Sequence, residues 1–167
     1  MNKKVTTIKD WIDLMVAQNA VCPEGVRRLA YCSTKTDVFR VLCDSFSSEW
    51  LHEMMLKGIP LPLDQFAKEY AAFVNGNRVM EYGEKGYTSK IYVKYKDLVV
   101  ADTTIVSLLD CQCGVEIPKN KFPRIIVSPH SKVAITMGIG SRLALDVFGD
   151  AYYTISGDNS KVRITKH

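Results

Sequence analysis

Several features that would place this chain of 167 residues in a common class are missing from its sequence. No run approaches the roughly 20 apolar residues that a membrane-spanning helix needs, so we expect no membrane insertion. Five cysteines, an odd number without regular spacing, argue against a secreted disulfide framework. The basic N-terminus is followed by Asp10 and Asp13 rather than by an unbroken apolar stretch, which does not favour a signal peptide. We therefore expect a reduced, cytoplasmic protein.

Concentrated charge and catalytic motifs are also missing. A net charge of +4 is mildly basic and falls short of the clustered charge that by itself indicates nucleic-acid binding. Gly138-Ile139-Gly140 lacks the third glycine and the helix of a phosphate-binding loop. Ser128-Pro129-His130-Ser131 is the local candidate for a nucleophile and base, and we interpret it as a polar corner before a strand. We predict no catalytic residues and favour a non-enzymatic protein.

The cysteines do not have the spacing of a metal site. Cys111 and Cys113 lie two residues apart, so on a strand they point to the same face, and we interpret them as small buried hydrophobic residues. No second Cys pair or Cys/His pair has a zinc-finger spacing. Helix packing explains Cys22, Cys32 and Cys43, although the sequence leaves open whether these three converge. We predict no metal and no cofactor.

Residues 1–78 have apolar side chains at helical spacing and are predicted to form a domain of short helices. A stripe along one face predicts the first helix, through Ile8, Trp11, Ile12, Met15 and Val16. Pro23 followed by Glu24 suits the first turn of a second helix, because proline has no donor to lose there and a carboxylate meets the positive end of the dipole. Further helices are predicted at about 36–42, 47–58 and 64–75.

Residues 79–167 are predicted to form a second domain, and their main feature is a ten-residue repeat of apolar positions. One ladder runs through Tyr95, Ile105, Val115, Ile125, Ile135, Leu145, Ile155 and, one residue early, Ile164. A second ladder lies two positions ahead, through Val93, Thr103, Cys113, Pro123, Val133, Leu143, Tyr153 and Val162. Because ten is even, each repeat preserves the in/out alternation of a β-strand.

A repeat of strand plus turn fits two architectures. One is a short parallel β-solenoid with coils of roughly 20 residues, and the other is an antiparallel meander. Small residues at the start of each repeat suit coil corners and favour the solenoid. Ile125, Leu145 and Ile164 would then stack on one wall, with Ile135 and Ile155 on the opposite wall. The fold class is therefore α+β: an N-terminal bundle of short helices followed by a β-repeat body.

The residues that carry a resemblance to a known group of proteins are Asn19-Ala20-Val21-Cys22-Pro23-Glu24-Gly25, Cys43 and Ser48-Glu49-Trp50-Leu51. This pattern resembles the helical opening of small uncharacterised proteins of phages and bacterial mobile elements, which have Ala-Cys-x-x-Gly, then a Cys and a Trp-Leu pair, with short β-repeats often following. It covers about residues 8 to 56. The chain departs from it by inserting Val21 and by having Ser47-Ser48-Glu49 where Arg-Gly-Asp-like residues are usual. The resemblance implies a phage or mobile-element origin, a non-secreted location and no catalytic assignment.

Outward positions of the β half carry many cations and one prominent aromatic residue. The candidate contact residues are Arg124, Lys132, Arg142, Tyr152, Lys161 and Arg163. In a solenoid Lys132 would neighbour Tyr152, and Arg142 would neighbour Lys161 or Val162. These residues would either contact a polyanion or keep the sheet soluble and guard its edge. We favour the second interpretation.

The sequence thus predicts a non-enzymatic interaction or structural module with an unknown protein partner. A polyanion- or nucleic-acid-binding protein is the alternative, and an enzyme of unidentified class comes third. We expect the helical half to cover the N-terminal end of the solenoid near Tyr92 and Tyr95. No helix follows Val162 to His167 to cap the other end, so we expect a homo-oligomer, most simply a two-fold dimer.

Overall fold

The computed structural model describes residues 8–17, 22–34, 37, 40–41, 49–58, 79–84, 86–158 and 161–167. Its helices are α1 (Ile8–Ala17), α2 (Pro23–Ala30) and α4 (Trp50–Leu56), each within a segment where helical spacing or capping predicts a helix. The helices predicted at 36–42 and 64–75 lie largely or wholly outside the described residues. The complete helical bundle and the division into two domains therefore stay predictions. No described helix is long and apolar enough to span a membrane.

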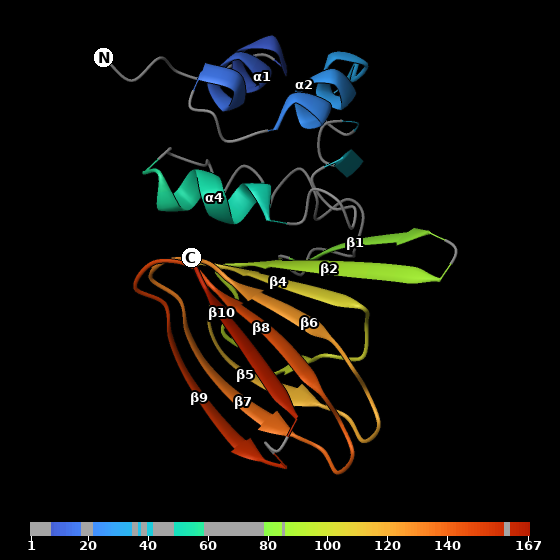
Figure 1. Ribbon diagram of the computed structural model, residues 1–167, viewed down its shortest axis with the longest axis vertical. Helices are drawn as coiled ribbons and strands as arrows, with labels where there is room; N and C mark the ends of the chain where they lie inside the picture. Colours follow the sequence, from blue (N-terminus) through green and yellow to red (C-terminus); the bar gives the residue numbers. More distant parts are fainter. Residues whose placement is uncertain are drawn as a thin grey trace.

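The second half folds into two sheets between which the chain alternates. The six-stranded sheet contains, in spatial order, β1 (Val79–Glu84), β2 (Tyr87–Val93), β4 (Ile105–Leu109), β6 (Arg124–Val127), β8 (Leu143–Val147) and β10 (Val162–Lys166). The four-stranded sheet contains β3 (Val99–Val100), β5 (Gln112–Ile117), β7 (Lys132–Met137) and β9 (Tyr152–Gly157). Strand β1 is antiparallel to β2, and every other described pair is parallel. The body is thus a short parallel β-solenoid of about four coils, which confirms the favoured prediction over the meander (Figure 1).

Inward-facing residues stack in register from one coil to the next. In the six-stranded sheet Leu145 pairs with both Ile125 and Ile164. In the four-stranded sheet Ile135 pairs with Ile155. These are the two walls predicted from the repeat. The side chains of Ile125, Leu145, Ile135 and Ile155 meet in one apolar core, whereas Ile164 on the last strand is 43% exposed.

The predicted first ladder is wrong at Ile105. Val106, not Ile105, pairs with Ile125, and Ile105 faces outward against Ile126 and Phe148. The step from Val106 to Ile125 is 19 residues and the next step, from Ile125 to Leu145, is 20. The last step, from Leu145 to Ile164, is again 19, and there the predicted ladder already places Ile164 one residue early. When the number of residues from one coil to the next is odd, a strict even repeat moves from the inner face of the sheet to its outer face.

The second ladder is wrong at its start for the same kind of reason. Val93 pairs with Leu109 and lies one position beyond the inward pair Tyr92 and Leu108. It therefore faces outward instead of stacking with Cys113. Only 16 residues separate Tyr92 from Leu108, so the first coil is shorter than the later ones and does not follow the ten-residue repeat.

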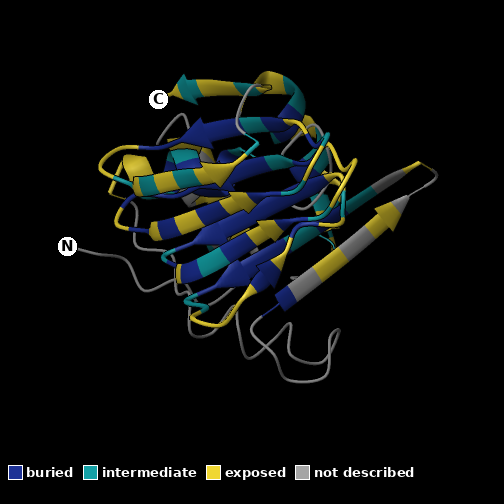
Figure 2. Cartoon of the chain, turned by 90° about the horizontal axis from the view of Figure 1, so that it is seen from below, coloured by how far each residue is buried: buried dark blue, intermediate teal, exposed yellow. Residues whose placement is uncertain are grey.

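The two sheets are buried in different ways. Strand β4 is buried at every position, whereas β7 alternates between exposed and buried residues, an alternation visible as yellow and blue bands in Figure 2. A strand buried on both faces needs a second layer of structure outside it. Helix α4, the helix nearest the solenoid in Figure 1, supplies part of that layer. Glu49 at its start contacts Arg124 of β6, and His52 lies against Phe148, which follows β8, with ring centroids 5.4 Å apart.

The observed contacts of α4 differ from the predicted cap at the N-terminal end of the solenoid. They lie on the outer face of the six-stranded sheet, at β6 and just beyond β8. At the N-terminal edge, β1 pairs antiparallel with β2 and so continues the sheet. Tyr92 and Tyr95 pack edge to face with ring centroids 5.0 Å apart, and Tyr92 belongs to the solenoid core.

Candidate anion-binding site

A groove of about 590 Å³ opens on the outer side of the solenoid, where β4, β6, β8 and β10 begin. Its cationic lining residues are Arg124, Arg142, Lys161 and Arg163. Apolar side chains lie between these cations. The volume is within the range of about 300–1,000 Å³ typical of small-molecule sites. We call this hollow the basic groove.

The coil repeat itself places two of the cations side by side. Val162 pairs with Leu143, and the Leu143 backbone N–H donates a hydrogen bond to the Lys161 carbonyl at 3.1 Å. Lys161 and Arg142 therefore occupy adjacent positions on neighbouring strands, which lie about 4.8 Å apart in a sheet. Like charges directly opposite one another destabilise a sheet, so this pair favours an anion nearby.

A small residue separates the other two cations. Ala144 pairs with Arg124 on one side and with Arg163 on the other. All three positions face outward, because the next residue of β8, Leu145, is in the core. The methyl group of Ala144 occupies little space between the two long side chains, which contributes to the hollow.

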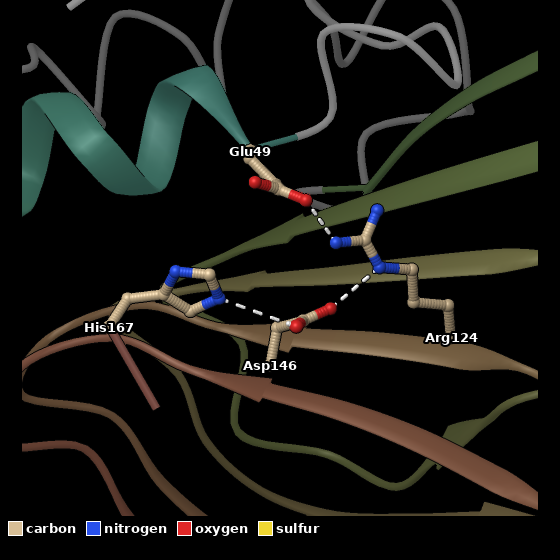
Figure 3. A network of polar contacts seen from close by, with 4 residues as sticks. All are labelled: Glu49, Arg124, Asp146 and His167. Atoms are coloured by element: carbon tan, nitrogen blue, oxygen red, sulfur yellow. Dashed lines mark hydrogen bonds and ion pairs between the residues drawn. The ribbon is translucent and has the colours of Figure 1, made fainter. Parts of the chain in front are cut away.

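Arg124 is neutralised by two carboxylates, as Figure 3 shows. Its Nε donates to Oδ2 of Asp146 at 2.6 Å, and its Nη2 donates to Glu49. The other carboxylate oxygen of Asp146 lies 3.4 Å from Nε2 of His167. Burial alone would lower the pKa of Arg124, but the hydrogen bonds and charges of Glu49 and Asp146 outweigh it and raise the pKa. Arg124 therefore joins the start of helix α4, which we call the helical head, to the solenoid. It adds little uncompensated charge to the groove.

The other three cations of the groove have no carboxylate partner among the described residues. These are Arg142, Lys161 and Arg163. The Arg142 guanidinium lies over the ring of Phe122, 5.3 Å from its centroid. A cation–π contact leaves the positive charge in place. The groove thus has a net positive field at the end away from Glu49.

The structure brings together four of the six contact residues predicted from the sequence, namely Arg124, Arg142, Lys161 and Arg163. The remaining two, Lys132 and Tyr152, are neighbours as predicted, but on β7 and β9 of the four-stranded sheet, outside the groove. A solenoid has two outer faces, one on each sheet. The ten-residue repeat places outward residues on both faces and does not separate the residues of one face from those of the other.

Three residues of the groove and of the contact between α4 and the sheet were not predicted from the sequence. Phe122 lies in the turn before β6. The sign of its role in the sequence is an aromatic residue between Lys121 and Pro123. Glu49 comes from the helical head, and nothing in the sequence links it to β6. His52 is fully buried between α4 and the sheet, and its isolated position in the sequence gives no sign of this.

The corner at residues 128–131 does not assemble a catalytic triad. His130 Nδ1 lies 2.9 Å from Oδ2 of Asp150, so the structure contains an exposed Asp–His pair. Ser128 and Ser131 are buried, and their hydroxyls hydrogen-bond each other at 3.1 Å. Among the described contacts neither hydroxyl reaches His130, as a nucleophile would. The geometry agrees with a polar corner.

Cys111 and Cys113 lie in the solenoid core, 0% and 7% exposed, as predicted for small buried residues. A hydrogen bond with Cys113 together with burial raises the pKa of the Cys111 thiol, which keeps it protonated. The part of the chain that the structure describes contains no group of three or more His, Cys, Asp or Glu side chains able to hold a metal. Cys43 lies outside the described residues, so the convergence of Cys22, Cys32 and Cys43 is not described.

Comparison of the chain with protein-family models, with curated proteins and with solved structures finds no match. The resemblance to phage and mobile-element proteins therefore stays a prediction. The basic groove is the feature of the described structure that bears on function.

Proposed function

We propose that this protein is a non-enzymatic binding module that holds an anionic partner in the basic groove. The observation that carries the proposal is the convergence of Arg142, Lys161 and Arg163, which have no carboxylate partner among the described residues. Repulsion between like charges this close lowers the stability of the sheet, and an anion in the groove removes it.

The composition of the groove favours binding over catalysis. Its described lining contains cations, apolar side chains and the hydroxyl of Thr104, but no His, Cys, Asp or Glu. General acid–base and nucleophilic catalysis most often use such groups, and the two lining residues of other catalytic types, Thr104 and Lys161, have no His, Asp or Glu partner among the described residues. Lys161 and Arg163 lie at the edge strand β10, where guarding charges are also found. Arg142 precedes β8, which is not an edge strand, and its position in the same groove favours the polyanion alternative over the solubilising role.

Titration calorimetry with inorganic polyphosphate tests the proposal. The double variant Arg142→Gln/Lys161→Gln should bind more weakly and with a flatter salt dependence. Counterion release contributes a slope of about 0.7–0.9 in log K against log salt for each neutralised phosphate, so two lost contacts should flatten the slope by about 1.5.

The matched control is Lys96→Gln/Lys132→Gln, which changes the charge equally at exposed residues outside the groove. It should keep the wild-type slope. Equal slopes for the two double variants would contradict the proposed site, and failure of the wild-type protein to bind polyphosphate at low salt would contradict the proposed function.

The resemblance around Cys22 and Trp50-Leu51 supports a phage or mobile-element origin, which we keep as part of the proposal. Genes of phage type beside this one in its genome are the expected finding. A neighbourhood of unrelated housekeeping genes would speak against it.

A further inference from the structure

We propose that the anionic partner is a single-stranded nucleic acid, with its phosphates on the cations of the basic groove and a base stacked on Phe122. This inference rests on the proposed function and adds the chemical class of the partner. The apolar lining of the groove and the exposed ring at its edge carry it.

Apolar side chains line the groove between its cations. Ile105, Pro123 and Leu143 are buried and form its floor, and Ala144 is half-buried. The apolar group of the groove that water reaches is therefore mainly the ring of Phe122 at its edge. A polymer that consists of charge alone, such as polyphosphate, would leave this ring in contact with water, whereas a ligand that carries flat apolar groups beside its charges would cover it, which is favourable. Nucleobases attached to a phosphate backbone have this combination.

Phe122 supplies a stacking surface at the same place as the charge. The residue is 61% exposed, so its ring is accessible to a ligand. Arg142 lies over the ring at 5.3 Å, so a guanidinium that can contact a phosphate adjoins an aromatic ring that can stack on a base. Proteins that bind single strands combine these two elements, and stacking tolerates any base.

The shape of the site favours one strand over a duplex. The backbone positions of Arg142 and Lys161 lie about 4.8 Å apart across neighbouring strands, and those of Lys161 and Arg163 about 7 Å apart along one strand. Long side chains on positions this close can reach successive phosphates of a single backbone. Sequence reading of duplex DNA uses a helix or β-ribbon that projects into a DNA groove. The basic groove is instead a hollow, and a single strand leaves its base faces free to stack there.

Fluorescence anisotropy with a labelled oligothymidylate of roughly 12 nucleotides tests the inference. Phe122→Leu keeps an apolar side chain and removes the aromatic face. It should weaken oligonucleotide binding by roughly five- to 100-fold, as expected for the loss of one stacked base. Its affinity for inorganic polyphosphate should stay at the wild-type value.

Ile139→Leu is the matched control, since Ile139 is 74% exposed in the corresponding turn of the next coil and does not line the groove. It should bind both probes like the wild-type protein. Both substitutions are at exposed positions, so unchanged melting temperatures are expected and confirm that each variant is folded.

The outcomes separate this inference from the proposed function. Wild-type oligonucleotide affinity in Phe122→Leu, together with polyphosphate binding by the wild-type protein, would overturn the nucleic-acid class and leave anion binding intact. Tighter binding of the complementary duplex, or of polyglutamate, than of the oligonucleotide would overturn it as well. Absence of binding to every polyanion would overturn the function itself.

Discussion

His52 lies where the helical head meets the solenoid. It is fully buried, and neither ring nitrogen has a hydrogen-bond partner within the described part of the chain. Its ring is tilted against Phe148, which in turn stacks on His167 at a centroid distance of 4.2 Å. Burial first, and then the charges of Arg124 and His167, lower the pKa of His52 to about 3. The imidazole is therefore neutral in the folded protein at neutral pH.

This buried histidine predicts that acid destabilises the protein. The pKa of His52 is lower in the folded state than the 6.5 of the free side chain, so the unfolded state takes up a proton first and stability falls as the pH drops from 6.5 toward 3. Between pH 7 and pH 5 the contribution of His52 to the loss in the free energy of unfolding should be about 2 kcal/mol. Urea unfolding at a series of pH values measures it.

A pair of variants assigns the effect to this residue. His52→Leu should lose that part of the acid sensitivity without loss of stability at pH 7, because it also removes two unpaired buried nitrogens. His130→Gln, at an exposed histidine, should keep the wild-type loss because His52 is still present. Identical pH profiles for the wild-type protein and His52→Leu would refute this account of the head contact.

At the scale of the strands, the two sheets show how neighbours decide burial. Strand β7 reads Lys132-Val-Ala-Ile-Thr-Met137 and alternates because one face meets the core and the other meets solvent. Strand β4 reads Ile105-Val-Ser-Leu-Leu109 without alternation, because its outer face is covered too. The absence of alternation in the sequence of β4 indicates a covering layer. The ten-residue repeat considers one position in each strand and therefore does not reveal it.

The register of β7 predicts opposite effects of the same substitution at adjacent positions. Ile135→Asp should unfold the protein, because an unpaired buried carboxylate costs several kcal/mol against a total stability of about 5–15 kcal/mol. Ala134→Asp places the carboxylate on the exposed outer face and should be tolerated. Thermal melts followed by circular dichroism compare the two. Similar melting temperatures would show that the register is wrong.

At the scale of the whole molecule, the last described rung of the solenoid is more exposed than the rung before it. Ile164 is 43% exposed, while its partner Leu145 one coil earlier is buried. Figure 2 shows the C-terminal strand in the colours of intermediate and exposed residues. Among the described residues β9 and β10 are edge strands of their sheets, and edge strands are where two chains can pair.

This exposed rung predicts a two-fold dimer through β10. Light scattering at micromolar concentration should give twice the monomer mass, and Ile164→Glu should return the monomer without unfolding it. Lys161, Arg163 and Lys166 lie on this rung, so added salt should strengthen the dimer by screening their repulsion. That is the reverse of its effect on polyanion binding. A monomer mass for the wild-type protein at all salt concentrations would exclude the dimer.

The sequence by itself indicated the repeat of the β half, favoured the solenoid over the meander and predicted that the cations face outward. A repeat of even length preserves strand parity, so Ile135 on Ile155 and Leu145 on Ile125 could be derived from spacing alone. Register within a solenoid is a local property, set by the number of residues in each coil. The prediction is correct from Ile125 onward, including Ile164, which the repeat places one residue early, and wrong at Ile105, where the coil is one residue short and the repeat does not show it.

The tertiary structure alone decided which cations share a groove and which are neutralised. Arg142 and Lys161 look like Lys132 in the sequence, but they stand on the outer side of the other sheet. Glu49 reaches Arg124 across 75 residues of chain, in a contact that depends on how α4 docks on the sheet. Such docking follows from the fit of two whole surfaces and not from a sequence period, so no spacing in the chain could reveal it.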